Sequence, residues 1–465
     1  MNLVLVWAWW TGMSWVAWIL DNLWYWESLI CLDSTESELT KKLEAKWIKV
    51  IIWNSKYIPT ISDHIIYSEA CTNSSEVLHA KSFKRKPKEQ RFIWNYFDFL
   101  WEISKYFTTV WITWTNWKST TTSLAIYTAK THLQNFGLWI LWALVPELDN
   151  NNYYINQDKK SEIKNILDYI FTGKWLNYSL IKKNIFILEA CEYKRHFLKL
   201  DIDRWIITNI ELDHTDYYKD LNDYTLAFQQ FTQKTKNKVI TTNLSLRDEW
   251  NESWQSIKHK LVNTTIKNFN FTHLFWQHNN QNWTLVFELI KQLNPSVDET
   301  KLTDTIQNFK WLRRRLELIQ TTKNGALVFS DYGHMASSIK FCYDAIHQKY
   351  PDKKITAIFQ PHQTDRIIRE WEQFQNALKP FQQKIIFDIY AAREDLPKQF
   401  KKFEEKTQIK VQNIEELGQI FAKFCNGNYT TDIQNILKII NIAKNDEIII
   451  FFSAWDLDFL IRKSI

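Results

Sequence analysis

Residues 110–122 read VWITWTNWKSTTT, and this stretch decides how the chain is expected to fold. An apolar run leads into it and a helix-like run extends beyond it to Leu133, which is the strand–loop–helix order of a phosphate-binding loop. Lys118 and Ser119 stand where such a loop carries its lysine and its metal-binding hydroxyl. Trp114 and Trp117 do not fit, because the loop must present bare backbone N–H groups to the phosphates and needs glycine to do so.

The composition resolves this contradiction. The chain of 465 residues has 25 tryptophans and 7 glycines, and the two together make up about 7% of it, the ordinary share of glycine alone. Residues 3–18, LVLVWAWWTGMSWVAW, become the glycine-rich LVLVGAGGTGMSGVAG by the same replacement. We therefore interpret most of the tryptophans as glycines of a gene that reads UGA as glycine, with some genuine indoles among them. If Trp114 and Trp117 are genuine, the loop is filled and the chain is non-catalytic.

Charge, cysteine content and hydropathy narrow the class of protein. The net charge of +6 comes from scattered lysines, which favours a solvated surface over a nucleic-acid interface. The five cysteines have no paired spacing, so we expect reduced thiols and neither a disulfide framework nor a zinc site. No signal-peptide pattern and no long apolar run is present in the sequence. We expect a cytoplasmic enzyme, monomeric or homodimeric, without a membrane span.

Short apolar runs alternate with longer amphipathic runs along the whole chain, the pattern of α/β proteins with parallel sheets. We predict three domains: a Rossmann-like nucleotide domain over residues 1–105, a central P-loop ATPase-like domain over 106–310 and a second Rossmann-like domain over 311–465. The polar residues 149–164 are expected to form an irregular insertion. Asp33 and Glu189 each end an apolar run, and parallel sheets bind ligands at this edge.

With glycines restored, the chain resembles the Mur ligase family over nearly its whole length. The loop becomes GTNGKST, and the later motifs that carry the resemblance follow in the family's order. They are ILEACEYKRHFL (residues 187–198), WIITNIELDHTDYY (205–218), FWQHNNQNW (275–283), FKWLRRRLE (309–317), SDYGH (330–334), IFQPHQTDR (358–366), DIYAARE (388–394) and SAWDL (453–457).

The resemblance implies an ATP-dependent ligase of peptidoglycan precursor synthesis. ATP would activate the lactyl carboxylate of UDP-N-acetylmuramate as an acyl phosphate, which the amine of L-alanine then attacks. Two magnesium ions are implied as cofactors. A ligase that attaches a tripeptide to the same UDP-sugar is the alternative, because it shares the first-domain loop.

The resemblance also implies site residues. The catalytic set is Lys118, Glu189, His214, Arg315 and His334. The ATP set is Thr113, Trp114, Thr115, Asn116, Trp117, Lys118, Ser119, Thr120, Asn279, Arg315 and Asp331, with Arg314 and Asn282 close by. The UDP-sugar set is Trp9, Trp10, Thr11, Gly12, Met13, Ser14 and Asp33. The amino-acid set is Tyr332, His334, His362 and Arg366, and the metal set is Ser119, Glu189 and His214, beside Asp213.

Other readings of these residues stay open. The first domain could bind NAD, Glu189 could cap the next helix, and Asp213 with His214 could be a helix cap with a surface histidine. The sequence also departs from the family pattern: Met335 and Ala336 replace His-Pro, and Gln363 replaces an arginine near the amino-acid site. Asn116 replaces a common histidine, and residues 53–55 lack the usual Gly-His. These departures concern the amine substrate more than the reaction class.

Overall fold

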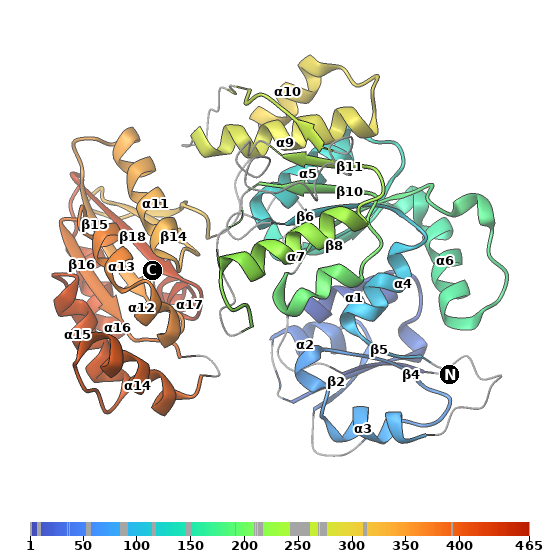
Figure 1. Ribbon diagram of the computed structural model, residues 1–465, viewed down its shortest axis with the longest axis horizontal. Helices are drawn as coiled ribbons and strands as arrows, with labels where there is room; N and C mark the ends of the chain where they lie inside the picture. Colours follow the sequence, from blue (N-terminus) through green and yellow to red (C-terminus); the bar gives the residue numbers. More distant parts are fainter. Residues whose placement is uncertain are drawn as a thin grey trace. The chain divides into compact units, whose positions relative to one another are not determined.

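A computed structural model describes residues 2–6, 11–34, 36, 38–52, 57–83, 92–113, 118–145, 151–190, 192–208, 210, 212, 217–241, 261–267, 269, 277–309, 314–391 and 394–464. The chain divides into two compact units, one formed by residues 1–272 and 277–309 and the other by 273–276 and 310–465 (Figure 1). No helix in the described ranges combines the length and the apolar character needed to cross a bilayer.

The first sheet has five parallel strands in the order β3-β2-β1-β4-β5. They are β1 (Leu3–Val6), β2 (Leu29–Asp33), β3 (Lys49–Ile52), β4 (His64–Tyr67) and β5 (Ile93–Asn95). The helices between and after them are α1 (Thr11–Asn22), α2 (Glu38–Glu44), α3 (Ser75–Ser82) and α4 (Tyr96–Ser104). Strands β1, β2 and β4 are buried along their whole length, as expected where helices cover both faces of a parallel sheet.

The second sheet has seven strands in the order β12-β11-β10-β6-β9-β7-β8. They are β6 (Thr108–Thr113), β7 (Phe136–Val145), β8 (Asn151–Ile155), β9 (Ile185–Glu189), β10 (Arg204–Ile207), β11 (Lys238–Thr241) and β12 (Leu261–Asn263). The helices are α5 (Lys118–His132), α6 (Lys160–Thr172), α7 (Leu221–Lys234), α9 (Gln277–Leu293) and α10 (Glu299–Gln307). Within the described residues, the strand pairs of this sheet are parallel except that of β7 with β8, which is antiparallel.

The expectation of an irregular insertion at residues 149–164 is wrong. This stretch supplies the antiparallel edge strand β8 and the first turns of α6. Its polar side chains bond to α1 of the first sheet: Asn152 Nδ2 donates to Ser14 Oγ at 3.1 Å, and Asn22 Nδ2 donates to Tyr153 Oη at 3.0 Å. The polar composition of this stretch therefore belongs to an edge strand, and its polar side chains form hydrogen bonds with residues far away in the sequence.

The second unit holds a six-stranded sheet in the order β13-β14-β18-β15-β16-β17, with β13 antiparallel at one edge. The strands are β13 (Glu317–Thr321), β14 (Leu327–Asp331), β15 (Lys354–Gln360), β16 (Gln383–Phe387), β17 (Asn428–Thr430) and β18 (Glu447–Ser453). The helices are α11 (Ala336–Lys349), α12 (Thr364–Arg369), α13 (Trp371–Leu378), α14 (Leu396–Thr407), α15 (Ile414–Phe424), α16 (Ile433–Ile442) and α17 (Leu457–Ser464). Three successive α/β sheets confirm the predicted fold class.

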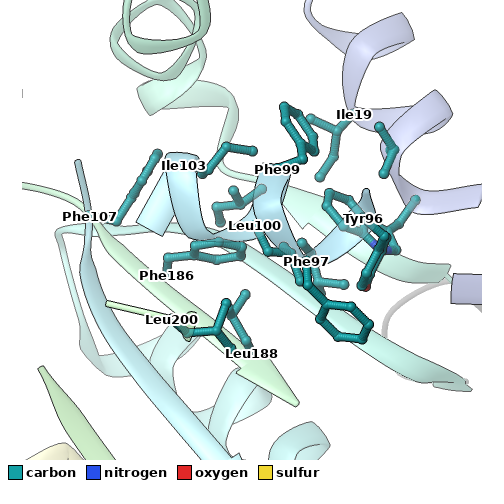
Figure 2. Packing of buried hydrophobic residues seen from close by; sticks show 14 of the residues in the cluster. Ile19, Tyr96, Phe97, Phe99, Leu100, Ile103, Phe107, Phe186, Leu188 and Leu200 are labelled. Carbon is teal, nitrogen blue, oxygen red and sulfur yellow. The ribbon is translucent and has the colours of Figure 1, made fainter. Parts of the chain in front are cut away.

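Helix α4 joins the first two sheets into one unit. Its apolar side chains pack on Ile19 of α1 and on Phe186 and Leu188 of β9, so one continuous hydrophobic core serves both sheets (Figure 2). Phe97 also stacks on the buried His196 ring, at 4.1 Å between centroids. The N-terminal and central sheets are thus held together by burial of aromatic and aliphatic surface.

The backbone at Trp47 has the conformation of a glycine. Trp47 follows α2 with a φ of 67° and a side chain that is 86% exposed. Its N–H donates to the Glu44 carbonyl at 2.9 Å, and the Ile48 N–H donates to the Leu43 carbonyl at 3.2 Å. This pair of bonds is a Schellman motif, whose left-handed position is normally glycine.

Trp24 repeats the pattern at the end of α1. Its φ is 63° and its side chain is 61% exposed, and the same two types of bond run from Trp24 to Asp21 and from Tyr25 to Leu20. Trp205 is different, because it lies in the extended strand β10, is buried and donates from Nε1 to Thr113 Oγ1 at 2.7 Å. At Trp24 and Trp47 the backbone adopts the left-handed conformation that glycine favours, as the glycine interpretation expects.

We predict that Trp47→Gly raises the free energy of unfolding by about 0.5–1 kcal/mol, because a Cβ atom costs energy in the left-handed region and glycine removes it. Urea unfolding monitored by circular dichroism measures the change. Trp47→Ala is the matched control, since it removes the indole and keeps the Cβ, and it should give no such gain. Equal stabilisation by alanine and glycine would contradict the backbone explanation.

A second prediction concerns acid stability. Burial lowers the pKa of His196 to about 4, and the charges of Lys199 and Lys194 act in the same direction. The unfolded chain therefore binds this proton more readily, so stability is lost as pH falls from about 6.5 to 4, by up to ~3 kcal/mol. His196→Phe should remove this loss. Unfolding curves at pH 7 and pH 4.5 test it, with the exposed His347→Gln as control; the same acid loss in both variants would contradict it.

Candidate functional site

The carboxyl edge of the central sheet brings two predicted metal-site residues together. Strands β6 and β9 are parallel neighbours with Ile112 opposite Glu189, so Glu189 ends its strand where β6 leads toward α5. Ser119, in the first turn of α5, places its Oγ 3.2 and 3.3 Å from the two Glu189 carboxylate oxygens. A hydroxyl and a carboxylate are oxygen donors of the kind that magnesium prefers. The residues present therefore fit a magnesium ion beside a phosphate.

Lys118, the first residue of α5, forms an ion pair that the sequence analysis did not single out. Its Nζ lies 2.5 and 2.6 Å from the two carboxylate oxygens of Glu192, and Glu192 is 0% exposed. Glu192 is three residues beyond Glu189 in the motif at 187–198. That second acidic residue was the available signal, but its spacing does not reveal which cation it meets.

Two tyrosines, Tyr218 and Tyr224, donate hydrogen bonds to Glu192. Tyr218 Oη donates to the Glu192 carbonyl at 2.5 Å, and Tyr224 Oη donates to Glu192 Oε1 at 3.4 Å. Burial, followed by the charge of Glu192, raises the pKa of Tyr218, so its hydroxyl stays a proton donor. Tyr218 ends the motif at 205–218, which ties that motif to the Lys118 pair. Asp213 and His214 of the motif lie outside the described residues.

The other predicted ATP residues in this unit are placed in part. Thr113 ends β6 and its hydroxyl accepts the Trp205 indole bond. Thr120 is buried in α5, and its hydroxyl has no hydrogen-bond partner among the described residues. Asn279 belongs to α9, whose backbone is described there while its side chain is not, and Asn282 is buried. Trp114, Thr115, Asn116 and Trp117 lie outside the described residues.

The residues predicted for the UDP-sugar begin α1 and end β2. Thr11 and Gly12 start the helix, Met13 is fully buried in the core, and Ser14 is occupied by its bond from Asn152. Asp33 ends β2 as expected, buried, and its Oδ1 accepts the Ser34 N–H at 2.6 Å. Trp9 and Trp10 lie outside the described residues.

In the second unit, Asp331 organises two loops. It is buried at the end of β14, where one carboxylate oxygen accepts the Leu316 N–H at 2.7 Å and the other accepts the Gly333 N–H at 2.6 Å. Burial raises the pKa of this carboxyl. Asp331 was predicted to contact ATP, and its two backbone partners indicate that it also sets the positions of residues 314–316 and 332–334.

Tyr332 lies close to two arginines. The Cζ atoms of Arg314 and Arg315 are 5.0 and 5.2 Å from the centre of its ring, within cation–π range. The Tyr332 N–H donates to the Arg314 carbonyl at 2.7 Å, which fixes the pair of loops. Arg314 Nη2 donates a hydrogen bond to the Ser453 carbonyl. The guanidinium of Arg314 thus binds the backbone at the end of β18.

The histidines predicted for the amino-acid site stand in an aromatic row. The ring centroids of His334 and His362 are 5.8 Å apart, and those of His362 and Tyr390 are 5.5 Å apart. Trp455 stacks on Tyr390 at 4.1 Å between centroids. These residues follow β14, β15, β16 and β18, so the carboxyl edge of this sheet gathers them as the second sheet gathers its own set.

Arg366 lies buried in the short helix α12, whose start is held by a carboxylate. Glu394 accepts the Thr364 N–H at 2.6 Å and the Asp365 N–H at 2.9 Å. Glu394 was not predicted as a site residue, although it ends the quoted motif DIYAARE. Its bonds fix the helix that carries Arg366. Among the described residues, no group of three or more histidine, cysteine, aspartate or glutamate side chains could hold a metal ion.

Comparison with known proteins connects this geometry to a family. Residues 112–298 match the model described as the Mur ligase middle domain. The UDP-N-acetylmuramate–L-alanine ligase of Ligilactobacillus salivarius is 26% identical over 298 residues, covering 58% of this chain and 62% of that protein. The alignment thus spans less than two thirds of that relative. The ligase of the same name from Clostridium botulinum strain Okra is 28% identical over 461 residues, covering 91% of this chain and 89% of the relative.

The fold has a solved counterpart over its whole length. The crystal structure of UDP-N-acetylmuramate–alanine ligase from Thermotoga maritima matches with a TM-score of 0.66 at 17% identity, covering 100% of this chain and 98% of that one. At this identity, the likeness establishes the three-domain α/β fold.

The buried ion pair generates a prediction. Lys118→Met should lower the free energy of unfolding by about 3–5 kcal/mol, because it leaves the Glu192 carboxylate buried without its cation. The double variant Lys118→Met/Glu192→Gln should recover most of the loss, since it removes the stranded charge. Denaturant unfolding of the parent, of the single variants Lys118→Met and Glu192→Gln and of the double variant completes the cycle. Additive losses in the double variant would contradict a direct interaction.

Proposed function

Because this chain belongs to the Mur ligase family, we propose that it joins L-alanine to the lactyl carboxylate of UDP-N-acetylmuramate at the expense of ATP. The observation that carries the proposal is the meeting of Lys118, Ser119 and Glu189 at the carboxyl edge of β6 and β9. A cation and a hydroxyl at the start of a helix, beside a carboxylate at the end of a neighbouring strand, are the groups that phosphoryl transfer from a nucleotide requires. The reaction belongs to the cytoplasmic stage of peptidoglycan precursor synthesis.

The chemistry consists of two displacements. A lactyl carboxylate oxygen attacks the γ-phosphorus of ATP, the bond to the β-phosphate oxygen breaks, and ADP leaves. The amine of L-alanine then attacks the acyl carbon, loses a proton, and inorganic phosphate departs. Both steps build negative charge on phosphate oxygens, so cations rather than a covalent nucleophile lower the barrier.

Each residue of the first unit has a defined role in this proposal. Lys118 pairs with the β- and γ-phosphates, and Ser119 with Glu189 would hold one magnesium ion. Magnesium, when bound, neutralises charge on the phosphate oxygens. His214 is assigned to a second ion, and residues 9–14 with Asp33 to the UDP-sugar.

The second unit supplies the remaining roles. We assign Arg315 to the transferring phosphate, with His334 and Tyr332 at the reacting groups, and Arg366 with His362 to the amino-acid carboxylate. A buried guanidinium offers two parallel N–H donors to a carboxylate. Gln363 has a φ of 74° immediately before α12 and brings no charge, so Arg366 carries most of the recognition of the carboxylate.

The decisive experiment compares two proteins. One has tryptophan at positions 9, 10, 114 and 117, as in the sequence, and the other has glycine at these four positions. Calorimetric titration with ATP should show binding by the glycine variant and none by the chain with tryptophan at these positions, because a loop that binds phosphates with its backbone N–H groups has no room for two indoles. The glycine variant should then release phosphate when UDP-N-acetylmuramate and L-alanine are both present.

Three results would count against this proposal. ATP binding by the chain with tryptophan at these positions would refute the steric argument. Failure of the glycine variant to bind ATP would refute the nucleotide site itself. Phosphate release with a murein tripeptide and none with L-alanine would replace the amine substrate. A Trp175→Gly variant, altered at an exposed indole away from the loop, controls for the effect of substitution as such.

A further inference from the structure

The Lys118–Glu192 pair sets a condition on nucleotide binding. Lys118 contacts both oxygens of a fully buried carboxylate, so its charge is already neutralised. The phosphates of ATP need the same Nζ. They also approach Glu192, whose negative charge repels them across a short, poorly solvated distance. Glu192 and the nucleotide therefore compete for one lysine.

We propose that Glu192 is a positioning residue that holds Lys118 while the site is empty and lowers nucleotide affinity, because phosphate must draw Lys118 away from it. This inference rests on the proposed function, since it requires Lys118 to meet a phosphate. It assigns Glu192 a role opposite to that of Ser119 and Glu189, which favour the bound nucleotide.

The surroundings of Glu192 allow the pair to open at the lysine end. Lys118 is partly exposed on a four-carbon stem, whereas Glu192 is fixed at its carbonyl by Tyr218 and at its carboxylate by Tyr224. The two tyrosine rings pack edge to face at 4.7 Å between centroids. When Lys118 moves, the carboxylate keeps the Tyr224 hydroxyl as a donor and is not left wholly unpaired.

Weakened affinity serves turnover in a ligase. ADP retains the phosphate nearest the loop after transfer, so an enzyme that binds ATP strongly through Lys118 also retains its product. A carboxylate that reclaims Lys118 favours ADP release. Glu192→Gln should therefore lower the KM for ATP without raising kcat.

The test uses the full chain with glycine at positions 114 and 117 as parent. Titration calorimetry with ATP should give a Kd about tenfold lower for Glu192→Gln, the order expected when one nearby negative charge is removed. Glu192→Asp keeps the charge and should stay within about twofold of the parent. Glu162→Gln removes a carboxylate of α6 that is paired with Lys183, outside the Lys118–Glu192 pair, and should leave the Kd unchanged.

Tyr224→Phe provides an opposite and independent change. It keeps the buried ring and removes the donor that holds Glu192 once Lys118 has left, so the Kd for ATP should rise about threefold. Thermal unfolding of every variant verifies that the folded protein is being titrated. If Glu192→Gln does not fold, the Tyr224→Phe result decides.

The outcomes separate this inference from the proposed function. An unchanged Kd in Glu192→Gln would reduce Glu192 to a structural role and overturn the inference. A higher Kd would mean that Glu192 presents Lys118 to the phosphate, which overturns it as well. A parent that binds no ATP would overturn the proposed function and this inference together, whereas a parent that binds ATP leaves the proposed function intact in either case.

Discussion

The parallel pairing of β6 with β9 is the constraint on which the first unit depends. Ile112 of β6 lies opposite Glu189 of β9, so both strands end at the same edge of the sheet. The first turn of α5, which follows β6, therefore lies beside the acidic residues Glu189 and Glu192. Ser119 then meets Glu189, and Lys118 meets Glu192. A shift of the register by one residue would turn each side chain to the other face of the sheet. The chemistry of this edge is thus a consequence of backbone pairing.

Carboxylates perform the same structural task in both units. Asp331 accepts the Leu316 N–H beside Arg315, the half-buried Glu394 accepts the Thr364 N–H at the start of the helix that carries Arg366, and Asp203 accepts the Thr109 N–H at the start of β6. The backbone N–H groups at the start of a helix, at the start of a strand or in the adjoining loop need acceptors that regular secondary structure does not supply there. A charged acceptor supplies them and fixes the position of the segment.

The sequence alone predicted the succession of α/β sheets along the chain and the ends of two strands at Asp33 and Glu189. Apolar runs, and the acidic residues that end them, are local signals. The sequence was insufficient for residues 149–164, where Asn152 and Tyr153 are satisfied by α1 more than a hundred positions away. Glu192 escaped notice for the same reason. Spacing places a carboxylate at an edge, but the partner across that edge is decided by how strands are ordered in space.

The left-handed backbone at Trp24 and Trp47 has a consequence for how the gene is translated. A helix that ends in a Schellman motif needs one residue in the left-handed region, a conformation that glycine adopts without the cost of a Cβ atom. Backbone conformation can therefore sort tryptophan codons: an indole in an extended strand with a bonded Nε1, such as Trp205, is compatible with its own side chain. An exposed indole at positive φ, as at Trp24 and Trp47, is where the glycine interpretation predicts a UGA codon.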